Sequence, residues 1–251
     1  MVSILTTLLG VFLGILATLT LDFLKPLRHR LSSKGIDSLK VPPVTVVSET
    51  DLDVIYAGHP DWIATRYWIA RLPTDLPHGG RGAYRHWVIS QGGFDKGYSV
   101  VMVNIVAESD ATVVIRPPLI DVTSVVSLEE PGVELVRTVG GAETRPRAFE
   151  VHLDSHPEVV KLVAGDDRDA TLTYTWNMRR GDVETFLIRV MVHAPGVWKW
   201  RARVPALTNG RMHYFEVNDD GHDFTTVGSD TKVSSEWVRD ESGWVRRGSE
   251  R

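Results

Sequence analysis

The 251-residue sequence contains no cysteine, which excludes a disulfide framework and any metal site built on thiolates. It also lacks a glycine-rich nucleotide loop and the Gly-x-Ser-x-Gly turn of serine esterases. None of its nine histidines has the spacing of a zinc hydrolase on a plausible single face. The sequence therefore predicts no cofactor and favours a protein without enzymatic activity.

Positive charge is scarce outside the N-terminal part of the chain. The formal net charge is −4, yet residues 1–42 hold five Lys/Arg and two Asp, for +3. This leaves 23 of the 28 Lys/Arg and 30 of the 32 Asp/Glu, for −7, in the rest. Nucleic-acid-binding proteins usually carry a basic face on the folded domain, so no nucleic acid partner is expected.

Charged side chains are absent from Met1 to Leu21. As a helix, this segment would be about 31 Å long, which matches the hydrocarbon thickness of a bilayer. A secretory signal peptide normally has a Lys or Arg before its apolar run and a cleavage site after it, and this segment has neither. Residues 1–24 are therefore predicted to form one transmembrane helix.

Basic residues follow this predicted helix closely and none precedes it. They are Lys25, Arg28, Arg30 and Lys34. The positive-inside rule then places the C-terminal part in the cytoplasm, in a single-pass protein of the cell membrane. The same side chains can bind the anionic headgroups of the lipid bilayer. Residues 25–43, which end in two prolines, are predicted to be a basic juxtamembrane linker.

Small residues recur every four positions in the predicted membrane helix, at Thr6, Gly10, Gly14 and Thr18. This spacing puts them on one helix face, where small side chains let two helices approach closely. The pattern predicts a homodimer through the transmembrane helix.

Residues 44–229 contain many short runs rich in Val, Ile, Thr, Tyr and Trp between turn residues, which predicts an antiparallel β-sandwich, immunoglobulin-like or larger. Val197–Val204 is the clearest strand, because apolar residues alternate with basic ones. Tyr98–Ala107 and Phe186–Val192 are apolar on almost every residue, which predicts central strands covered on both faces. Tyr84–Ser90 is predicted to be a further strand.

Two stretches bear on whether residues 44–251 form one domain. Residues 129–146 are rich in Gly and Pro and are an expected internal boundary, which would make two sandwiches, or one long connection. In residues 230–251, Trp237-Val238-Arg239 is echoed by Trp244-Val245-Arg246 across a turn signal. This end of the chain is expected to be a tail or a small hairpin.

The first candidate site is the basic face of the Val197–Val204 strand. Lys199, Arg201 and Arg203 share that face, and Arg189 from a neighbouring strand would extend it. Such a patch would bind an anionic ligand, such as a lipid headgroup or an acidic protein. The alternative is a solvated sheet face that resists aggregation.

The second candidate site is a group of carboxylates at Asp219, Asp220 and Asp223, beside Asn218 and His222. Hard oxygen ligands at this short spacing could hold Ca²⁺. The order of the residues does not follow the usual calcium-loop pattern, and Asn, Asp and Gly form tight turns by themselves. A metal site and a simple turn both remain open.

Together these features predict a membrane-anchored β-sandwich that acts as a binding or interaction module for an unknown protein partner. One alternative is an exported cell-envelope domain of opposite topology that binds through Trp62, Trp68 and Trp87. Another is an unrecognised hydrolase that uses histidine and carboxylate groups near His213 and His222.

Overall fold

A computed structural model describes residues 42–57, 62–77, 84–140, 147–163, 175–241 and 243–248. The chain divides into two units, Met1–Pro42 and Pro43–Arg251, and the elements below belong to the second. The predicted transmembrane segment 1–24, most of the linker 25–43, and the following predicted residues lie outside the described ranges: Thr6, Gly10, Gly14, Thr18, Lys25, Arg28, Arg30 and Lys34. Among the residues that are described, no helix has the length and apolar character needed to cross a membrane.

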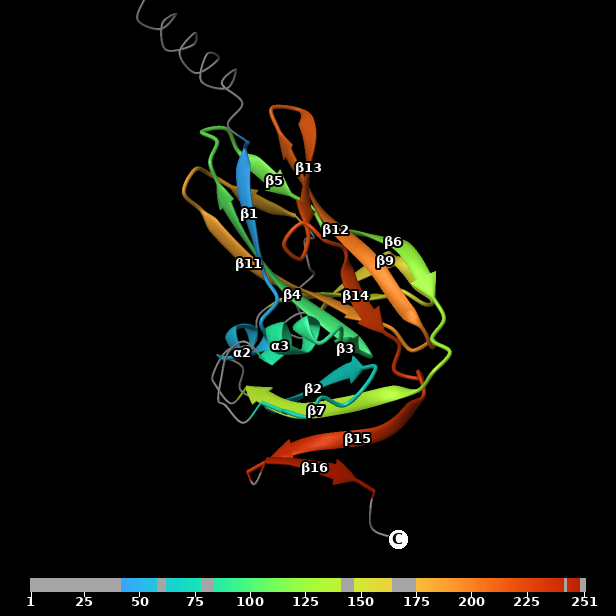
Figure 1. Ribbon diagram of the computed structural model, residues 1–251. Coiled ribbons are helices and arrows are strands. Elements are labelled where there is room, and N and C mark those ends of the chain that lie inside the picture. The colour runs from blue at the N-terminus through green and yellow to red at the C-terminus, as the bar shows by residue number, and fades with distance from the viewer. Residues whose placement is uncertain are drawn as a thin grey trace, which may run out of the picture. The chain divides into compact units, whose positions relative to one another are not determined.

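Two β-sheets dominate this unit, and strands account for 61% of the described chain against 6% for helices, which confirms the predicted mainly β class. The five-stranded sheet has the order β1 (Val44–Glu49), β4 (Tyr98–Ala107), β11 (Val183–Met191), β8 (Ala148–His152) and β9 (His156–Val163). The main path of the eleven-stranded sheet is β10 (Trp176–Met178), β5 (Val113–Ile115), β12 (Val197–Thr208), β14 (Phe224–Val227), β3 (Phe94–Lys96), β2 (Trp62–Ile69), β7 (Gly132–Gly140), β15 (Val233–Asp240) and β16 (Gly243–Arg247). Strands β6 (Leu119–Val126) and β13 (Arg211–Val217) both pair with β12. The helices are α2 (Leu52–Ile55) and α3 (Tyr84–Ser90), and Figure 1 shows them beside β2 and β7.

The sheets are mixed, which corrects the prediction of a purely antiparallel arrangement. Three strand pairs are parallel: β8 with β11, β3 with β14, and β7 with β15. Parallel neighbours need long connections between them, so each joins segments that are distant in the sequence. Alternation of side chains is the same in both kinds of pair, so the sequence pattern could not distinguish them.

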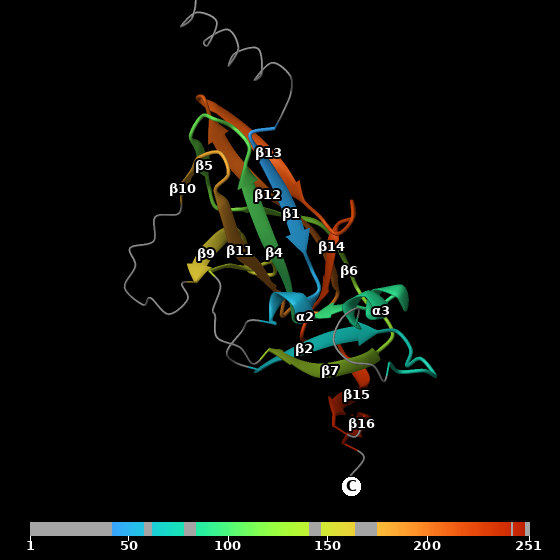
Figure 2. The same cartoon turned by 90° about the vertical axis from the view of Figure 1, so that its left-hand side faces the viewer.

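The strand β4 has a hydrophobic core on each of its faces. Val101, Val103 and Ile105 belong to one core cluster, which also contains Trp200 of β12. Val100 belongs to a second cluster, formed mainly by α2, α3, β2 and β7. Figure 2 shows the same layers from the side. The sequence-based expectation that this apolar run is covered on both faces is confirmed for the N-terminal half of β4, where Ser99 to Val101 are all buried.

The segment Tyr84–Ser90 is the helix α3, so its prediction as a strand is wrong. Tyr84 and Val88 are both buried, and their spacing of four residues puts them on one side of a helix. Tyr84 and Val88 pack in the core cluster with β2 and β7, and Trp87 packs against it. Tertiary packing of this apolar stripe therefore outweighs the strand preference of the aromatic and β-branched residues.

The stretch 129–146, expected to be an internal boundary, contains the strand β7. Gly132 is the first residue of this strand. A Cβ at this position would lie 2.3 Å from the ring of Trp68 and 2.6 Å from the carbonyl oxygen of Ile69, so a larger residue would clash. The glycine therefore permits close packing between β7 and β2, and does not mark a turn.

We expect Gly132→Ala to lower the free energy of unfolding by about 1–3 kcal/mol, because the added methyl group must displace the Trp68 indole. Urea unfolding of the full chain measures this change. In a Trp68→Leu background the same substitution should cost less, since the smaller side chain leaves room. An equal cost in both backgrounds would show that the indole is not the obstacle.

The C-terminal end of the chain forms the hairpin of β15 and β16, and β15 also pairs in parallel with β7. Trp244 of this hairpin stacks on Tyr84 of α3, with ring centroids 5.6 Å apart. Its indole N–H donates to the carbonyl oxygen of Pro77 at 3.2 Å. The hairpin is therefore part of the folded domain.

Candidate functional site

The predicted basic face lies on β12, where Trp200, Ala202 and Val204 are buried and alternate with the three basic residues. Arg201 pairs with Asp223, and Arg203 donates to Asp121 through Nε at 3.0 Å and Nη2 at 2.7 Å. The Arg203 guanidinium also lies over the exposed ring of Tyr214, 5.7 Å from its centroid. Carboxylates from neighbouring segments thus offset the positive charge of this face.

Lys199 and Arg189 are the other residues predicted for this face. Lys199 is exposed on β12, and it contributes to lowering the pKa of Asp223 after the hydrogen bonds from Thr123 and Arg201. Arg189 lies on β11, in the other sheet, so the prediction that it extends the basic face is wrong.

The carboxylates of the predicted metal site point to separate partners. Asp219 accepts a hydrogen bond from Arg85 Nη2 at 3.1 Å, whereas Asp223 binds Arg201 and Thr123. Asp220 has a left-handed backbone with φ of +50°, and Asp219 and His222 exchange backbone hydrogen bonds across the turn. Among the described residues, no group of three His, Asp or Glu side chains could hold a metal ion. This segment is built as a turn.

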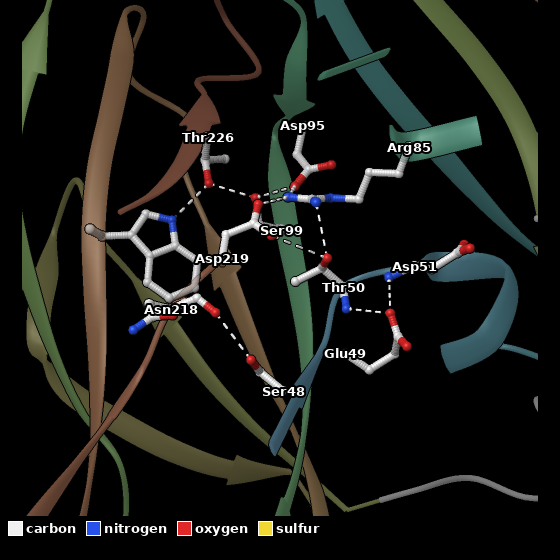
Figure 3. A network of polar contacts seen from close by, with 11 residues as sticks. Ser48, Glu49, Thr50, Asp51, Arg85, Asp95, Ser99, Asn218, Asp219 and Thr226 are labelled. Carbon is white, nitrogen blue, oxygen red and sulfur yellow. Dashed lines mark hydrogen bonds and ion pairs between the residues drawn. The ribbon is translucent and has the colours of Figure 1, made fainter. Parts of the chain in front are cut away.

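A buried polar network connects this turn to the interior (Figure 3). Arg85 of α3 lies at its centre and donates to Thr50 at 3.0 Å, to Asp219 at 3.1 Å and to Asp95 at 3.4 Å. Asp95 of β3 also accepts a hydrogen bond from Ser99 at 2.9 Å. The network therefore joins α3, β3, β4, the end of β1 and the 218–223 turn.

The same network reaches the main core through two hydroxyl groups. Ser99 lies 2.6 Å from Thr226 Oγ1, and Thr226 accepts a hydrogen bond from the indole of Trp200 at 3.0 Å. At the other end, Ser48 donates to the carbonyl oxygen of Asn218 at 3.0 Å. The Ser99–Thr226 and Ser48–Asn218 contacts join residues 127 and 170 positions apart, so the network fixes elements that the chain order leaves far apart.

Burial is the largest influence on the pKa of Asp95. Its side chain is 5% exposed, and desolvation raises the pKa of this carboxyl above its usual range, although Arg85 and Ser99 act in the opposite direction. One of its oxygens, Oδ1, is buried without a hydrogen-bond partner among the described residues. Asp95 therefore depends strongly on Arg85 for compensation of its charge.

A second buried group of charges lies where β2, β3 and β7 meet. Lys96 donates to Glu134 at 2.8 Å and to the carbonyl oxygen of Ser229 at 3.0 Å, and Arg66 reaches the other oxygen of Glu134 at 2.7 Å. Lys96 and Glu134 are both buried. These contacts satisfy the charges within the sheet, which is the arrangement of a structural ion pair.

Tyr84 is the centre of an aromatic cluster. Its ring stacks with Trp87 at 5.7 Å and with Trp244 at 5.6 Å, and the guanidinium of Arg137 lies 4.8 Å from its centroid. Its hydroxyl group is buried without a hydrogen-bond partner among the described residues. Burial raises the pKa of Tyr84, while the positive charges of Arg137 and Arg239 lower it.

An open pocket of about 380 Å³ lies between β7 and the turn that joins β15 to β16. Its lining consists of two residues of β7, two of β15 and one of the turn that follows: Arg137, Thr138, Arg239, Asp240 and Glu241. Arg137 is held by two hydrogen bonds to Asp53, including Nη1 to Oδ2 at 3.0 Å. Two arginines and two acidic residues therefore line this pocket, and the guanidinium of Arg137 is paired with Asp53 of α2.

None of the residues named for the two alternative functions is among the residues that line this pocket. Trp68 is buried, Trp87 stacks on Tyr84, and Trp62 lies in β2 with a side chain outside the described set. His213 lies on β13 beside Phe215, and His222 lies in the 218–223 turn. Sequence reasoning did not identify the pocket or the Arg85 network, because their residues come from segments far apart in the chain and form no local motif.

Comparisons with known proteins found no matching family model, no matching curated protein and no matching solved structure.

Proposed function

We propose that this protein is a membrane-anchored binding module that holds a small charged ligand in the pocket between β7 and the β15–β16 turn. The observation that carries the proposal is the convergence of Arg137, Arg239, Asp240 and Glu241 on one pocket. Pockets of 300–1,000 Å³ are typical of small-molecule sites, and this one lies at the small end of that range.

The lining favours a ligand that carries both signs of charge. Arginine presents up to five donors in a planar fork, so Arg137 and Arg239 can bind a carboxylate while they keep other contacts. Asp240 and Glu241 lie in the same lining and complement a cation. An amino-acid-like or dipeptide-like molecule satisfies both requirements.

Part of this site is rigid before any ligand arrives. Asp53 accepts two hydrogen bonds from the Arg137 guanidinium, which also lies over the ring of Tyr84, 4.8 Å from its centroid. A preorganised charged group loses less conformational entropy on binding than a free side chain does. Arg137 is therefore expected to fix the orientation of the ligand.

Calorimetric titration of the full chain in detergent micelles tests this function. The dipeptide Lys-Glu, which carries both charges, should bind, and acetate and butylammonium should bind more weakly. Arg239→Gln should weaken Lys-Glu binding by about tenfold or more, because a hydrogen bond to a charged group is lost. Arg203→Gln, on the face of β12, is the matched control and should bind normally. Equal binding by both variants, each folded by thermal melting, would contradict the assignment of the pocket.

The membrane part of the proposal rests on the uncharged segment Met1–Leu21 and on the cations that follow it. Reporters fused after Arg251 test the topology, one active only in the cytoplasm and one active only outside the cell. A cytoplasmic signal is expected and directs the search for ligands to the cell interior. An external signal would reverse the orientation and favour the exported alternative.

A further inference from the structure

The repeated tripeptide Trp-Val-Arg pairs with itself inside the C-terminal hairpin. In the antiparallel register of β15 and β16, Trp237 lies opposite Arg246, Val238 opposite Val245, and Arg239 opposite Trp244. Each tryptophan thus lies opposite an arginine in the register, and the two valines lie opposite each other. A Trp-Val-Arg segment is therefore complementary to an antiparallel copy of itself.

The second copy of this tripeptide lies on an edge strand. β16 is the last strand of the eleven-stranded sheet, beyond β15 in both ribbon views (Figures 1 and 2). Its outer side pairs with no strand in the part of the chain that the structure describes. Val245 is 47% exposed, although it is a large apolar residue. An edge with these properties is a template for a further strand.

We propose that two copies of this chain associate by pairing their β16 strands antiparallel, with Val245 on the two-fold axis. The register repeats the one between β15 and β16, so that Trp244 lies opposite Arg246 of the other copy and Val245 opposite its equivalent. Gly243 then faces Arg247. This surface is distinct from the pocket proposed as the ligand site.

Three features favour a second copy over an unrelated partner. First, the contact is self-complementary, as a two-fold symmetric interface requires, and no like charges lie directly opposite. Second, Arg246, which on an ordinary edge would discourage pairing, lies opposite Trp244 of the other copy in this register and not opposite a like charge. Third, Trp244 is already held against Tyr84 and Pro77, so the strand is ordered before it pairs.

The contact is small, because β16 has only five residues. Stable interfaces bury at least about 1,200 Å² in total, and a single added strand of this length buries less. Dimerisation should therefore be weak for dilute chains and stronger when chains are concentrated in one membrane plane.

Cross-linking tests the register directly, because the chain has no cysteine of its own. We expect full-length Val245→Cys in micelles or membranes to form a covalent dimer on oxidation or with a short bismaleimide, since directly opposite Cβ atoms lie about 5 Å apart. Val163→Cys, on the edge strand β9, and Val183→Cys, on β11, are the controls, because both valines are also exposed. Their yields should be much lower, and equal yields at all three positions would overturn the proposal.

A substitution that opposes two charges on the axis gives an independent test. Val245→Lys should raise the dissociation constant of the dimer by about two- to fivefold in a fluorescence-transfer assay, whereas Val245→Thr should leave it nearly unchanged. A Gly14→Ile background should weaken any association through the predicted membrane helix, so an effect of Val245→Lys that persists there belongs to β16. Unchanged association in Val245→Lys would rule out the β16 contact and leave the ligand pocket unaffected.

Discussion

Arg85→Met should lower the free energy of unfolding by about 3–5 kcal/mol at pH 7, because it leaves the carboxylate of Asp95 buried without its counter-charge. Methionine retains most of the apolar volume of the arginine side chain, so the loss of charge dominates. Asp219 contributes less to this cost, since 28% of its side chain is exposed and water can solvate it. Urea denaturation of the full chain measures the change.

The pH dependence of this variant has a defined sign. Desolvation already raises the pKa of Asp95 in the native chain, and removal of Arg85 raises it further. A carboxyl whose folded pKa exceeds its unfolded value stabilises the fold fully below the unfolded pKa of about 3.9, and this contribution is lost as the pH rises through the folded pKa. The difference between Arg85→Met and the native chain should therefore be small in acid and grow toward neutral pH.

Two further variants separate charge from packing at this network. Arg85→Met combined with Asp95→Asn should recover much of the lost stability, because no charge then remains buried and asparagine can still accept from Ser99. Asp219→Asn alone should cost less than Arg85→Met. A destabilisation of Arg85→Met that is independent of pH would mean that packing, and not the charge of Asp95, is responsible.

Trp200→Ala should cost about 3–5 kcal/mol, the range for truncation of a large aromatic residue in a packed core. Trp200 is completely buried, its ring lies 4.4 Å from that of Phe224, and its indole donates to Thr226 at 3.0 Å. The substitution removes all three interactions and leaves a cavity between the two sheets.

The neighbouring Trp198 is the matched control, since it lies on the same strand and only part of its side chain is buried. Trp198→Ala should cost less than Trp200→Ala in the same urea titration, because part of the Trp198 ring is already in water. Equal costs would indicate that the side chain of Trp200 is not the main contact between the sheets at this position.

Both predictions concern residues that support one another through Thr226. Thr226 accepts from Trp200 and lies 2.6 Å from Ser99, which in turn donates to Asp95. The polar network and the main core are therefore physically continuous. A double-mutant cycle between Arg85 and Trp200 should show whether this continuity also couples their energies.

Strand β12 shows how much of the local structure follows from sequence. Its alternation of apolar and basic residues correctly indicated that Trp200, Ala202 and Val204 are buried, because successive residues of a strand point to opposite faces. At the start of the strand the alternation is less clear, since Val197 is buried and Trp198 only partly so. The same alternation could not show that Asp121 and Asp223 lie beside Arg203 and Arg201. These partners are 82 and 22 residues away in the chain, and only strand pairing brings them together.

The sequence by itself determined the mainly β class, the inward face of β12 from Trp200 to Val204 and the double covering of the N-terminal half of β4, because each follows from the spacing of apolar residues along one segment. Tertiary structure alone decided that Tyr84–Ser90 is helical, that β7 occupies the expected boundary, and that Arg85 meets Asp95 and Asp219. These features depend on contacts between distant segments, such as the 134 residues that separate Arg85 from Asp219. Local periodicity carries no information about such contacts, since it records which face is buried and not what covers it.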